Sequence, residues 1–396
     1  MIHIAILGFG TVGSGVAEVL ATNGAAIDRR VNDSLNLKYI LDVRDCSDSR
    51  WEGRFVKDFS VIERDPEISI VVETIGGATA ALDFTRRALR AGKSVVTSNK
   101  EVVAEHGCEL LELAREHGVS YLFEASVGGG IPIIHPLYQC LGANEISQIT
   151  GILNGTTNYI LSRMIRAGLS FETALKEAQE KGYAERDPSA DVEGHDACRK
   201  ICILGAIAFG RHIYPRQVPT VGITGVSLED VSCAAALGCK VKLLGRAIRR
   251  EDGRVCAFVE PHFVPEEEPL AGVEDVFNAI SVTGNAIGDV MFYGRGAGKL
   301  PTASAVMADV MEVARGTRLP ALSWKEGGED AAVGPEELRS DWCVRVLGAA
   351  PEGVEPVDWS QAPAGQTALR LNGLTRGEME GALSGWKVQS AYRILG

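Results

Sequence analysis

The sequence predicts an α/β protein in three parts, and three features of the chain support this fold class. Residues 2–124 alternate short apolar strands with helices, a pattern typical of a parallel sheet covered by helices. From about residue 146 the pattern changes to mixed segments, which predict an α+β domain with an open, mostly antiparallel sheet and helices on one face. From about residue 327 the chain is richer in Gly, Pro and acids, which predicts a linker before a small C-terminal α+β tail.

Length and composition describe an ordinary globular protein. A chain of 396 residues is expected to hold two or three domains, at about 100–200 residues each. The net charge is −12 and there is no basic block, which argues against nucleic acid or an anionic membrane as a partner. No apolar run approaches the roughly 20 residues of a membrane span. The nine cysteines form no Cys-x-x-Cys pair and no signal peptide is evident, so we expect reduced thiols in the cytoplasm.

A glycine-rich turn follows the first predicted strand, residues 2–7, and opens a helix. Its sequence is Gly8-Phe9-Gly10-Thr11-Val12-Gly13. In this context Gly8 makes the tight turn, Gly10 lets the backbone approach a pyrophosphate, and Gly13 permits close packing of helix and strand. The N–H groups at the helix start, including Thr11 and Val12, would face the phosphates. We therefore expect a Rossmann-type domain that binds a dinucleotide; the alternative is a turn with only a structural role.

The second predicted strand, residues 37–43, ends in both an acid and a base. Asp42 would bind the ribose of NAD, whereas Arg44 would meet the 2′-phosphate of NADP, so the choice of coenzyme stays open. Lys57 is either a second cation for a phosphate or a solvated side chain.

Strands at 68–74, 94–97 and 121–124 and helices at 80–91 and 101–117 complete this region. Ser98 and Lys100 follow the strand at 94–97, and the carboxyl ends of such strands hold ligands. The alternative for Lys100 is a solvated lysine that opens the next helix. Three glycines, 128–130, leave backbone carbonyls accessible to a bound ion or cofactor beside Glu124, or else form a hinge.

The second region contains a polar turn at 154–159, which predicts a helix start with N–H groups free to bind a carboxylate. Another glycine turn at 294–298 feeds a helix through about Arg315, which we expect to return to the first domain. The remaining elements are strands at 218–223, 241–247, 254–261, 279–284 and 289–293 and, in the tail, strands at 341–348, 367–371 and 386–395 with a helix at 375–383.

Residues 182–200 are dense in acids and bases and run into an almost wholly apolar helix. Asp196 and Lys200 are four residues apart and therefore share one helix face. An ordinary surface ion pair would contribute only about 0.3–0.5 kcal/mol. Charges at the start of a buried helix are costly unless they are paired or used, so we favour an acid/base cluster that faces a polar substrate.

Taken together, these motifs resemble the homoserine dehydrogenase family over residues 2–316. The matching stretches are 8–13, 98–100, 124–132, 154–159, 182–200 and 293–306. The resemblance implies NAD(P)-dependent interconversion of L-homoserine and L-aspartate 4-semialdehyde. It also implies a nucleotide domain at 1–135 completed by 294–320, a substrate and dimerisation domain at 136–293, a reduced ACT-like tail at 330–396, and a homodimer or homotetramer.

The resemblance also implies roles for individual residues. Lys100 and Lys200 match the catalytic lysines; Thr156, Tyr183, Glu185, Asp191 and Asp196 match substrate contacts, the first two through their backbone. Gly296 and Ala297 join the coenzyme residues already named. A monovalent cation, sodium in relatives, would be held mainly by backbone oxygens of Glu124, Val127, Gly129 and Ile131.

The chemistry suits these residue types independently of the resemblance. Hydride transfer needs a protein group to handle the proton on oxygen, and a lysine made less basic by another lysine is a suitable acid or base. Glu185 and Asp191 are natural acceptors for the ammonium of an amino acid.

The end of the chain departs from the family pattern, in which a βαββαβ regulatory domain is usual. Only 55 residues run from Trp342 to Gly396, and residues 354–366 are too short and proline-broken for a first helix, so control by threonine is not expected. Two alternatives to homoserine dehydrogenase are a coenzyme-binding sensor without turnover and a dehydrogenase for another small amino alcohol or amino aldehyde, whose selectivity His195 could alter.

Overall fold

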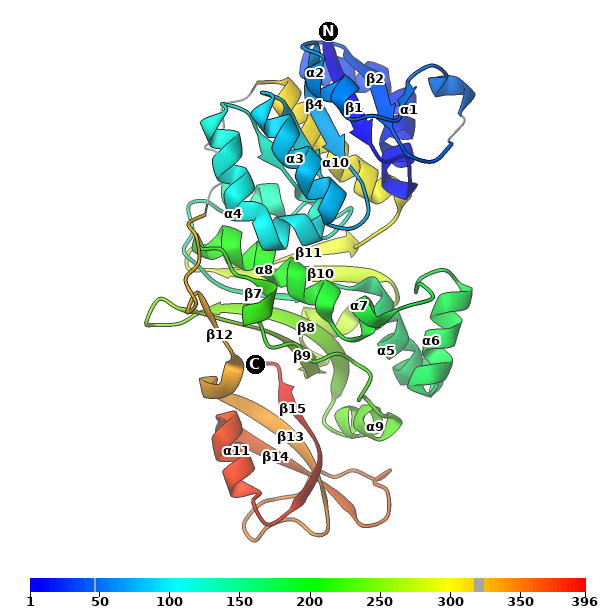
Figure 1. Ribbon diagram of the computed structural model, residues 1–396. Coiled ribbons are helices and arrows are strands. Elements are labelled where there is room, and N and C mark those ends of the chain that lie inside the picture. The colour runs from blue at the N-terminus through cyan, green and yellow to red at the C-terminus, as the bar shows by residue number, and fades with distance from the viewer. Residues whose placement is uncertain (46–47, 317–323) are drawn as a thin grey trace. The chain divides into compact units, whose positions relative to one another are not determined.

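The computed structural model describes residues 1–45, 48–316 and 324–396, which form two compact units (Figure 1). The first unit comprises Met1–Glu145, Ile203–Tyr214 and Gly294–Gly328; the second comprises Ile146–Cys202, Pro215–Tyr293 and Glu329–Gly396. Residues 317–320, which end the nucleotide domain expected from the sequence, lie outside the described residues. No helix of the described chain is long and apolar enough to cross a membrane.

The first unit is built on a six-stranded parallel sheet of order β3-β2-β1-β4-β5-β6. The apolar runs predicted at residues 2–7 and 94–97 form strands with those bounds, and the other predicted strands differ by a few residues at their ends. The strands are β1 (Ile2–Leu7), β2 (Leu35–Leu41), β3 (Phe55–Val56), β4 (Ile68–Glu73), β5 (Ser94–Thr97) and β6 (Tyr121–Leu122).

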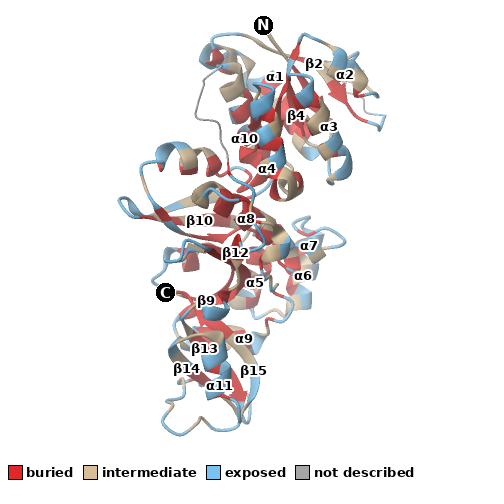
Figure 2. Ribbon diagram, turned by 60° about the vertical axis from the view of Figure 1, so that its left-hand side comes forward, coloured by how far each residue is buried: buried red, intermediate tan, exposed pale blue. Residues whose placement is uncertain are grey.

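Helices pack on this sheet through small and branched apolar side chains. A core cluster joins β1 and β2 to helices α1 and α10 through residues such as Ile6, Ile40, Val16 and Val306, which are buried. Figure 2 shows β4, in the middle of this sheet, coloured red as buried. The helices are α1 (Thr11–Val31), α2 (Ser60–Arg64), α3 (Thr79–Arg90), α4 (Lys100–Glu116) and α10 (Lys299–Ala314).

The strand order places the carboxyl end of β1 between those of β2 and β4. The chain leaves β1 toward β2 and leaves the adjacent β4 toward β5, in opposite directions across the sheet. Such a point is where open α/β sheets bind their ligands. The glycine turn, Asp42 and Glu73 all belong to this edge.

The second unit contains a nine-stranded, mostly antiparallel sheet, as the sequence predicts. Its order is β11-β10-β7-β8-β9-β15-β13-β14, with β12 paired to β9. The strands are β7 (Ile146–Ile152), β8 (Cys239–Arg249), β9 (Val255–Pro265), β10 (Phe277–Gly284), β11 (Gly288–Arg295), β12 (Ala332–Val333), β13 (Ser340–Leu347), β14 (Gln366–Leu374) and β15 (Lys387–Ile394).

The strand predicted at residues 218–223 is wrong. Pro219 has no N–H to donate, and only a single bridge, Thr220 to Val259, joins this segment to β9. The Ile223 N–H instead donates to the Val192 carbonyl at 2.8 Å. A Cβ on Gly222 would lie 2.0 Å from the Val192 oxygen, so only glycine allows this approach. Residues 218–223 therefore pack against the turn at residues 192–194, which precedes helix α8 (His195–Phe209).

Two helices of the second unit, α5 (Gly155–Ala167) and α8, take part in the polar cluster described below. Helix α5 follows β7 directly, and α8 carries Asp196 and Lys200; residues up to Cys202 of α8 belong to this unit and the rest to the first. The others are α6 (Phe171–Glu180), α7 (Ser189–Val192), α9 (Leu228–Ala236) and α11 (Arg376–Ala382).

From Ser340 onward the tail contributes three strands and one α-helix, β13-β14-α11-β15, and residues 348–365 contain no helix. A βαββαβ domain would have one more strand and one more helix. In their place, Pro356 forms a bridge to Leu369 of β14, and Val357 N–H donates to Ala368 at 2.8 Å. The pairing of β15 with β9 makes the tail part of the second unit's sheet.

Candidate active site

The glycine turn has the geometry that a pyrophosphate site requires. Gly8 has a φ of +87°, and a Cβ on Gly13 would lie 1.9 Å from the Gly8 oxygen, so neither position tolerates a side chain. No side chain caps the start of α1, and its first turn holds no acid. The N–H groups of Thr11 and Val12 are therefore available to an anion at the positive end of the helix dipole.

Asp42 and Arg44, at the end of β2, are engaged with each other. The Arg44 guanidinium donates to both Asp42 oxygens, at 3.0 and 2.7 Å, and the Phe9 N–H donates to Asp42 at 2.7 Å. The Arg44 guanidinium, aided by the backbone N–H groups of Phe9 and Arg44, keeps the pKa of the Asp42 carboxyl well below its usual range, although burial opposes this. The Arg44 side chain is 63% exposed, and the Lys57 ammonium donates to Val43 O at 3.1 Å. Two cations thus stand beside the carboxyl end of β2.

Lys100 is the first residue of α4 and follows the predicted coenzyme residue Ser98. Asn99 caps the helix, because its side chain accepts from the Val102 N–H at 3.2 Å. The Asn99 amide also donates to the carbonyls of Ile75 and Gly77, at 3.2 and 2.7 Å. Lys100 is therefore fixed at the same sheet edge as the glycine turn.

In the second unit the structure brings Asp191, Asp196 and Lys200 together around Asn154. The Lys200 ammonium donates to Asp196 and to the Leu153 carbonyl, each at 2.7 Å. The Asn154 amide donates to Asp191 at 2.7 Å and to Asp196 at 2.9 Å. The end of β7, the cap of α5, helix α7 and the first turn of α8 thus meet at one polar cluster.

The alternative of a surface ion pair is wrong, because the Lys200 and Asp196 side chains are only 8% and 4% exposed. Removing water from two charges costs several kcal/mol per ion unless hydrogen bonds replace it. Leu153 and Asn154 supply such bonds. Burial and the neighbouring Asp196 carboxylate raise the pKa of Asp191, although the hydrogen bond from Asn154 opposes this.

The other predicted substrate residues lie around this cluster with differing exposure. Thr156, buried, donates its hydroxyl to the Tyr183 carbonyl at 2.8 Å. The Tyr183 ring packs edge-on against Tyr159, with centroids 5.0 Å apart. Glu185 is exposed, and within the described chain no hydrogen bond or ion pair joins its carboxylate to the cluster.

The predicted cation residues form a loop held tightly against the start of α10. A Cβ on Gly129 would lie 2.4 Å from the Gly296 oxygen, and the Gly130 N–H donates to Arg295 at 3.0 Å. This brings Gly129 beside the predicted coenzyme residues Gly296 and Ala297. No hydrogen bond among the described residues ends on the carbonyls of Val127, Gly129 or Ile131, all of them buried residues. Buried carbonyls without a donor suit a hard cation such as sodium.

The Glu124 carboxylate is engaged within the loop, because it accepts the N–H groups of Ile133, Ile134 and His135 at 2.6–2.9 Å. The cation contact predicted for Glu124 is that of its backbone oxygen. His135 lies 3.1 Å from Asp309 and 3.0 Å from Glu312 of α10. Although burial lowers it, these acids raise the pKa of His135 to about 10. The loop is thus anchored to α10 by a charged imidazole.

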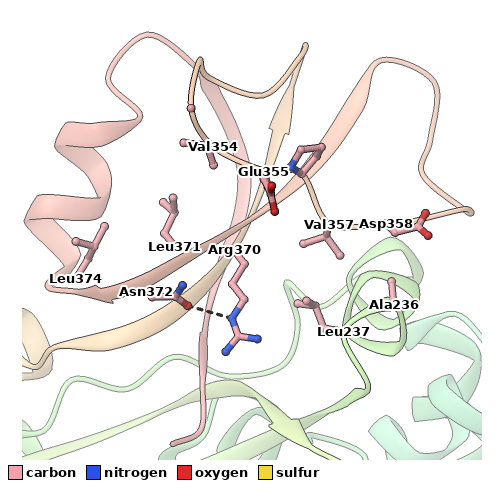
Figure 3. A pocket seen from close by; sticks show the side chains of 12 residues that line it. Ala236, Leu237, Val354, Glu355, Val357, Asp358, Arg370, Leu371, Asn372 and Leu374 are labelled. Atoms are coloured by element: carbon pink, nitrogen blue, oxygen red, sulfur yellow. Dashed lines mark hydrogen bonds between the residues drawn. The ribbon is translucent and has the colours of Figure 1, made fainter.

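The tail holds a separate cavity of ≈ 650 Å³, shown in Figure 3. It lies between β14, the end of α9 and the segment 353–358, which takes the place of the first helix of a full βαββαβ domain. Leu237, Val354 and Leu371 line it, and Arg370 at its side is bound to Asn372 and to Asp341.

Three groups escaped prediction from the sequence. Asn154 is predicted only as part of a polar turn, because the two acids that it binds lie 37 and 42 residues further along the chain. Glu73 is a lone acid that ends an otherwise apolar strand, which was also a usable signal. His135 and Asp309 are far apart in sequence, and nothing in their local patterns indicates that they pair.

Comparison with known proteins agrees with this geometry. Residues 8–124 match the family model described as homoserine dehydrogenase, NAD binding domain, and residues 132–311 match the model described as homoserine dehydrogenase. A homoserine dehydrogenase of Synechocystis sp. is 45% identical over 319 residues, covering 79% of this chain and 73% of that protein. One of Neisseria gonorrhoeae is 40% identical over 357 residues, covering 87% and 81%.

Solved structures show the same similarity. A homoserine dehydrogenase of Thiobacillus denitrificans superposes with a TM-score of 0.89 at 35% identity, covering 100% of this chain and 98% of that one. A hyperthermophilic archaeal homoserine dehydrogenase in complex with NADPH has a TM-score of 0.68 at 29% identity, covering 81% and 99%. The chain therefore belongs to the homoserine dehydrogenase family and is an oxidoreductase that uses a nicotinamide coenzyme, NAD or NADP.

Proposed function

We propose that this enzyme interconverts L-homoserine and L-aspartate 4-semialdehyde, as a step of threonine, methionine and isoleucine biosynthesis, with Lys200 and Lys100 as its catalytic residues. The observation that carries the proposal is the buried cluster of Asn154, Asp191, Asp196 and Lys200. It offers carboxylates to the substrate ammonium and an ammonium to the substrate oxygen. The sensor without turnover is disfavoured, because a chain that only binds coenzyme has no need for this cluster.

Each residue has a defined part in the proposed reaction. The bound nicotinamide supplies or accepts the hydride. Lys200 and Lys100 share the substrate oxygen, one donating the proton when the aldehyde is reduced and the other orienting the substrate. Asp196, 2.7 Å from the Lys200 ammonium, holds that group in place. Asp191 and Glu185 accept the substrate ammonium, with backbone contacts from Thr156 and Tyr183.

A monovalent cation, sodium, is also proposed, with the backbone oxygens of Glu124, Val127, Gly129 and Ile131 as its ligands. The carbonyls of the last three residues, which accept no hydrogen bond from the described chain, support this. Dimerisation or tetramerisation through the second unit's sheet is supported by the exposed Met291 and Tyr293 on its terminal strand, β11.

The substrate is tested by measuring initial rates with L-homoserine and close analogues, such as a shorter and a longer amino alcohol, each with NAD and with NADP. We expect homoserine to give the highest kcat/KM with either coenzyme. A higher kcat/KM for another amino alcohol would overturn the substrate assignment, and no rate with any of them would favour the sensor.

The lysine mechanism predicts that Lys200→Ala and Lys100→Ala each lower kcat by about 10²–10⁴, the usual effect of removing a positioned acid or base. Coenzyme affinity should hardly change, because the glycine turn holds the pyrophosphate. The KM for homoserine, measured in the same assay, should rise if either lysine also contributes to binding of the substrate in its ground state. Lys176→Ala, on the exposed face of α6, is the matched control. A folded, coenzyme-binding Lys200→Ala enzyme with kcat within a few-fold of the parent would exclude the mechanism.

The coenzyme site predicts dual use with a preference for NADP, because Arg44 and Lys57 both stand at the end of β2. Arg44→Ala should raise the KM for NADP much more than the KM for NAD. Arg254→Ala is a matched control, since Arg254 likewise pairs with the aspartate two residues before it, Asp252, with both donors on one carboxylate oxygen, in the second unit. Equal effects of Arg44→Ala on both coenzymes would show that Arg44 does not recognise the 2′-phosphate.

The tail, proposed to be a reduced ACT-like domain, should not bind threonine productively, because residues 348–365 lack the helix of a full βαββαβ module. Threonine at millimolar concentration should leave the rate nearly unchanged. The assay should be repeated with Arg370→Ala, which alters the cavity of Figure 3. Strong sigmoidal inhibition of the parent that Arg370→Ala abolishes would assign a regulatory site to this cavity and contradict the prediction.

A further inference from the structure

Glu73 is a buried acid that the mechanism above does not use. It ends β4, its side chain is 0% exposed, and no Lys, Arg or His of the described chain pairs with it. Burial raises its pKa to about 7, although hydrogen bonds from Thr97 and Ile75 oppose this. Removing a carboxyl from water without a paired cation is costly, so Glu73 is expected to have a specific role. The groups that it binds by hydrogen bonds indicate that role.

Those partners lie on the two segments that flank the coenzyme edge of the sheet. One Glu73 oxygen accepts the Ile75 N–H at 2.6 Å, at the start of the loop 75–77 that follows β4. The other is 2.6 Å from the Thr97 hydroxyl, at the end of β5 and directly across from Glu73 in the parallel register. Glu73 thus ties together the carboxyl ends of two adjacent strands.

Asn99 closes these contacts into a ring. Its N–H donates to the Thr97 hydroxyl at 2.9 Å, and its side-chain amide donates to Ile75 and Gly77 of the same loop. Its side-chain oxygen caps α4, whose first residue is Lys100. Displacing any member of the ring would therefore move both the loop and the first turn of α4.

We propose that Glu73 is a positioning residue for hydride transfer, which through Thr97 and Asn99 fixes the 75–77 loop and Lys100 at the coenzyme edge of the sheet. The inference rests on the catalytic role proposed for Lys100. Glu73 does not touch the reacting atoms; it acts by holding the ring of hydrogen bonds that places them. Misplacement by about 1 Å can slow a reaction 10²-fold.

The test compares Glu73→Ala and Thr97→Val, which remove ring contacts, with the conservative variants Glu73→Gln and Thr97→Ser, which keep them. Glutamine can accept from Ile75 and donate to the Thr97 oxygen, and serine retains the hydroxyl. For each, kcat and the KM for homoserine are measured, with the Kd of NADPH from its fluorescence and the melting temperature. Thr97→Val keeps the side-chain shape, so it tests the ring even if Glu73→Ala does not fold.

We expect kcat to fall about 10²-fold in Glu73→Ala and in Thr97→Val, and only a few-fold in the conservative variants. The Kd of NADPH should change only a few-fold, because the glycine turn is intact. The double variant Glu73→Ala/Thr97→Val should be no slower than the slower of these two single variants, because both substitutions break the same ring of hydrogen bonds.

A lowered melting temperature with unchanged kcat in the folded enzyme would show a purely structural role and overturn the inference. Loss of kcat in Glu73→Ala alone, with Thr97→Val unaffected, would overturn it as well. Failure of the proposed function gives a different result from failure of the positioning role. Full turnover by Lys100→Ala would exclude a catalytic role for Lys100, whatever the ring variants show. An inactive Lys100→Ala beside a fully active Thr97→Val would refute only the positioning role.

Discussion

The buried ion pair between Asp196 and Lys200 is the constraint on which the second unit's site depends. Neither ion can stay in a buried site without replacing its lost hydration, and removing one partner of such a pair typically costs about 3–5 kcal/mol. The Leu153 carbonyl and the Asn154 amide meet that requirement. The end of β7, the cap of α5 and the first turn of α8 must therefore stay together. The glycine contact of Gly222 with Val192 holds the turn that leads into α8, which makes an irregular segment essential to the geometry.

The first unit solves a different problem with mainly uncharged groups. An anionic dinucleotide can be held by backbone N–H groups of the glycine turn and the start of α1, with cations only at the end of β2. The carboxyl ends of β4 and β5 are joined by the hydrogen-bond ring of Glu73, Thr97 and Asn99, which needs no ion pair. The loop of residues 124–131, whose backbone oxygens are proposed to bind sodium, is anchored to α10 through His135 and Asp309. In the first unit oriented backbone groups therefore face the coenzyme and charge pairs support them, whereas in the second unit a buried charge pair lies within the polar cluster itself.

Local patterns in the sequence were enough to predict much of this arrangement. The strands at Ile2–Leu7 and Ser94–Thr97 are apolar runs ended by turn residues, and the spacing of Asp196 and Lys200 predicted a shared helix face. What escaped prediction depends on contacts between distant segments. The segment 218–223 has strand-like residues, but Pro219 and the contact of Gly222 with residue 192 divide its hydrogen bonds between two neighbours. The pairing of β15 with β9 and of His135 with Asp309 likewise joins residues more than 100 apart, for which no local pattern exists.

We propose that Asp196 and Lys200 act as one catalytic unit, and a double-mutant cycle on turnover is the most direct test. The kcat values of Asp196→Asn, Lys200→Met and the double variant would be compared under saturating homoserine and coenzyme. Residues that act as a unit are strongly non-additive. We predict that the double variant is about as slow as the slower single variant. Independent effects, in which the two losses in kcat multiply, would contradict the account.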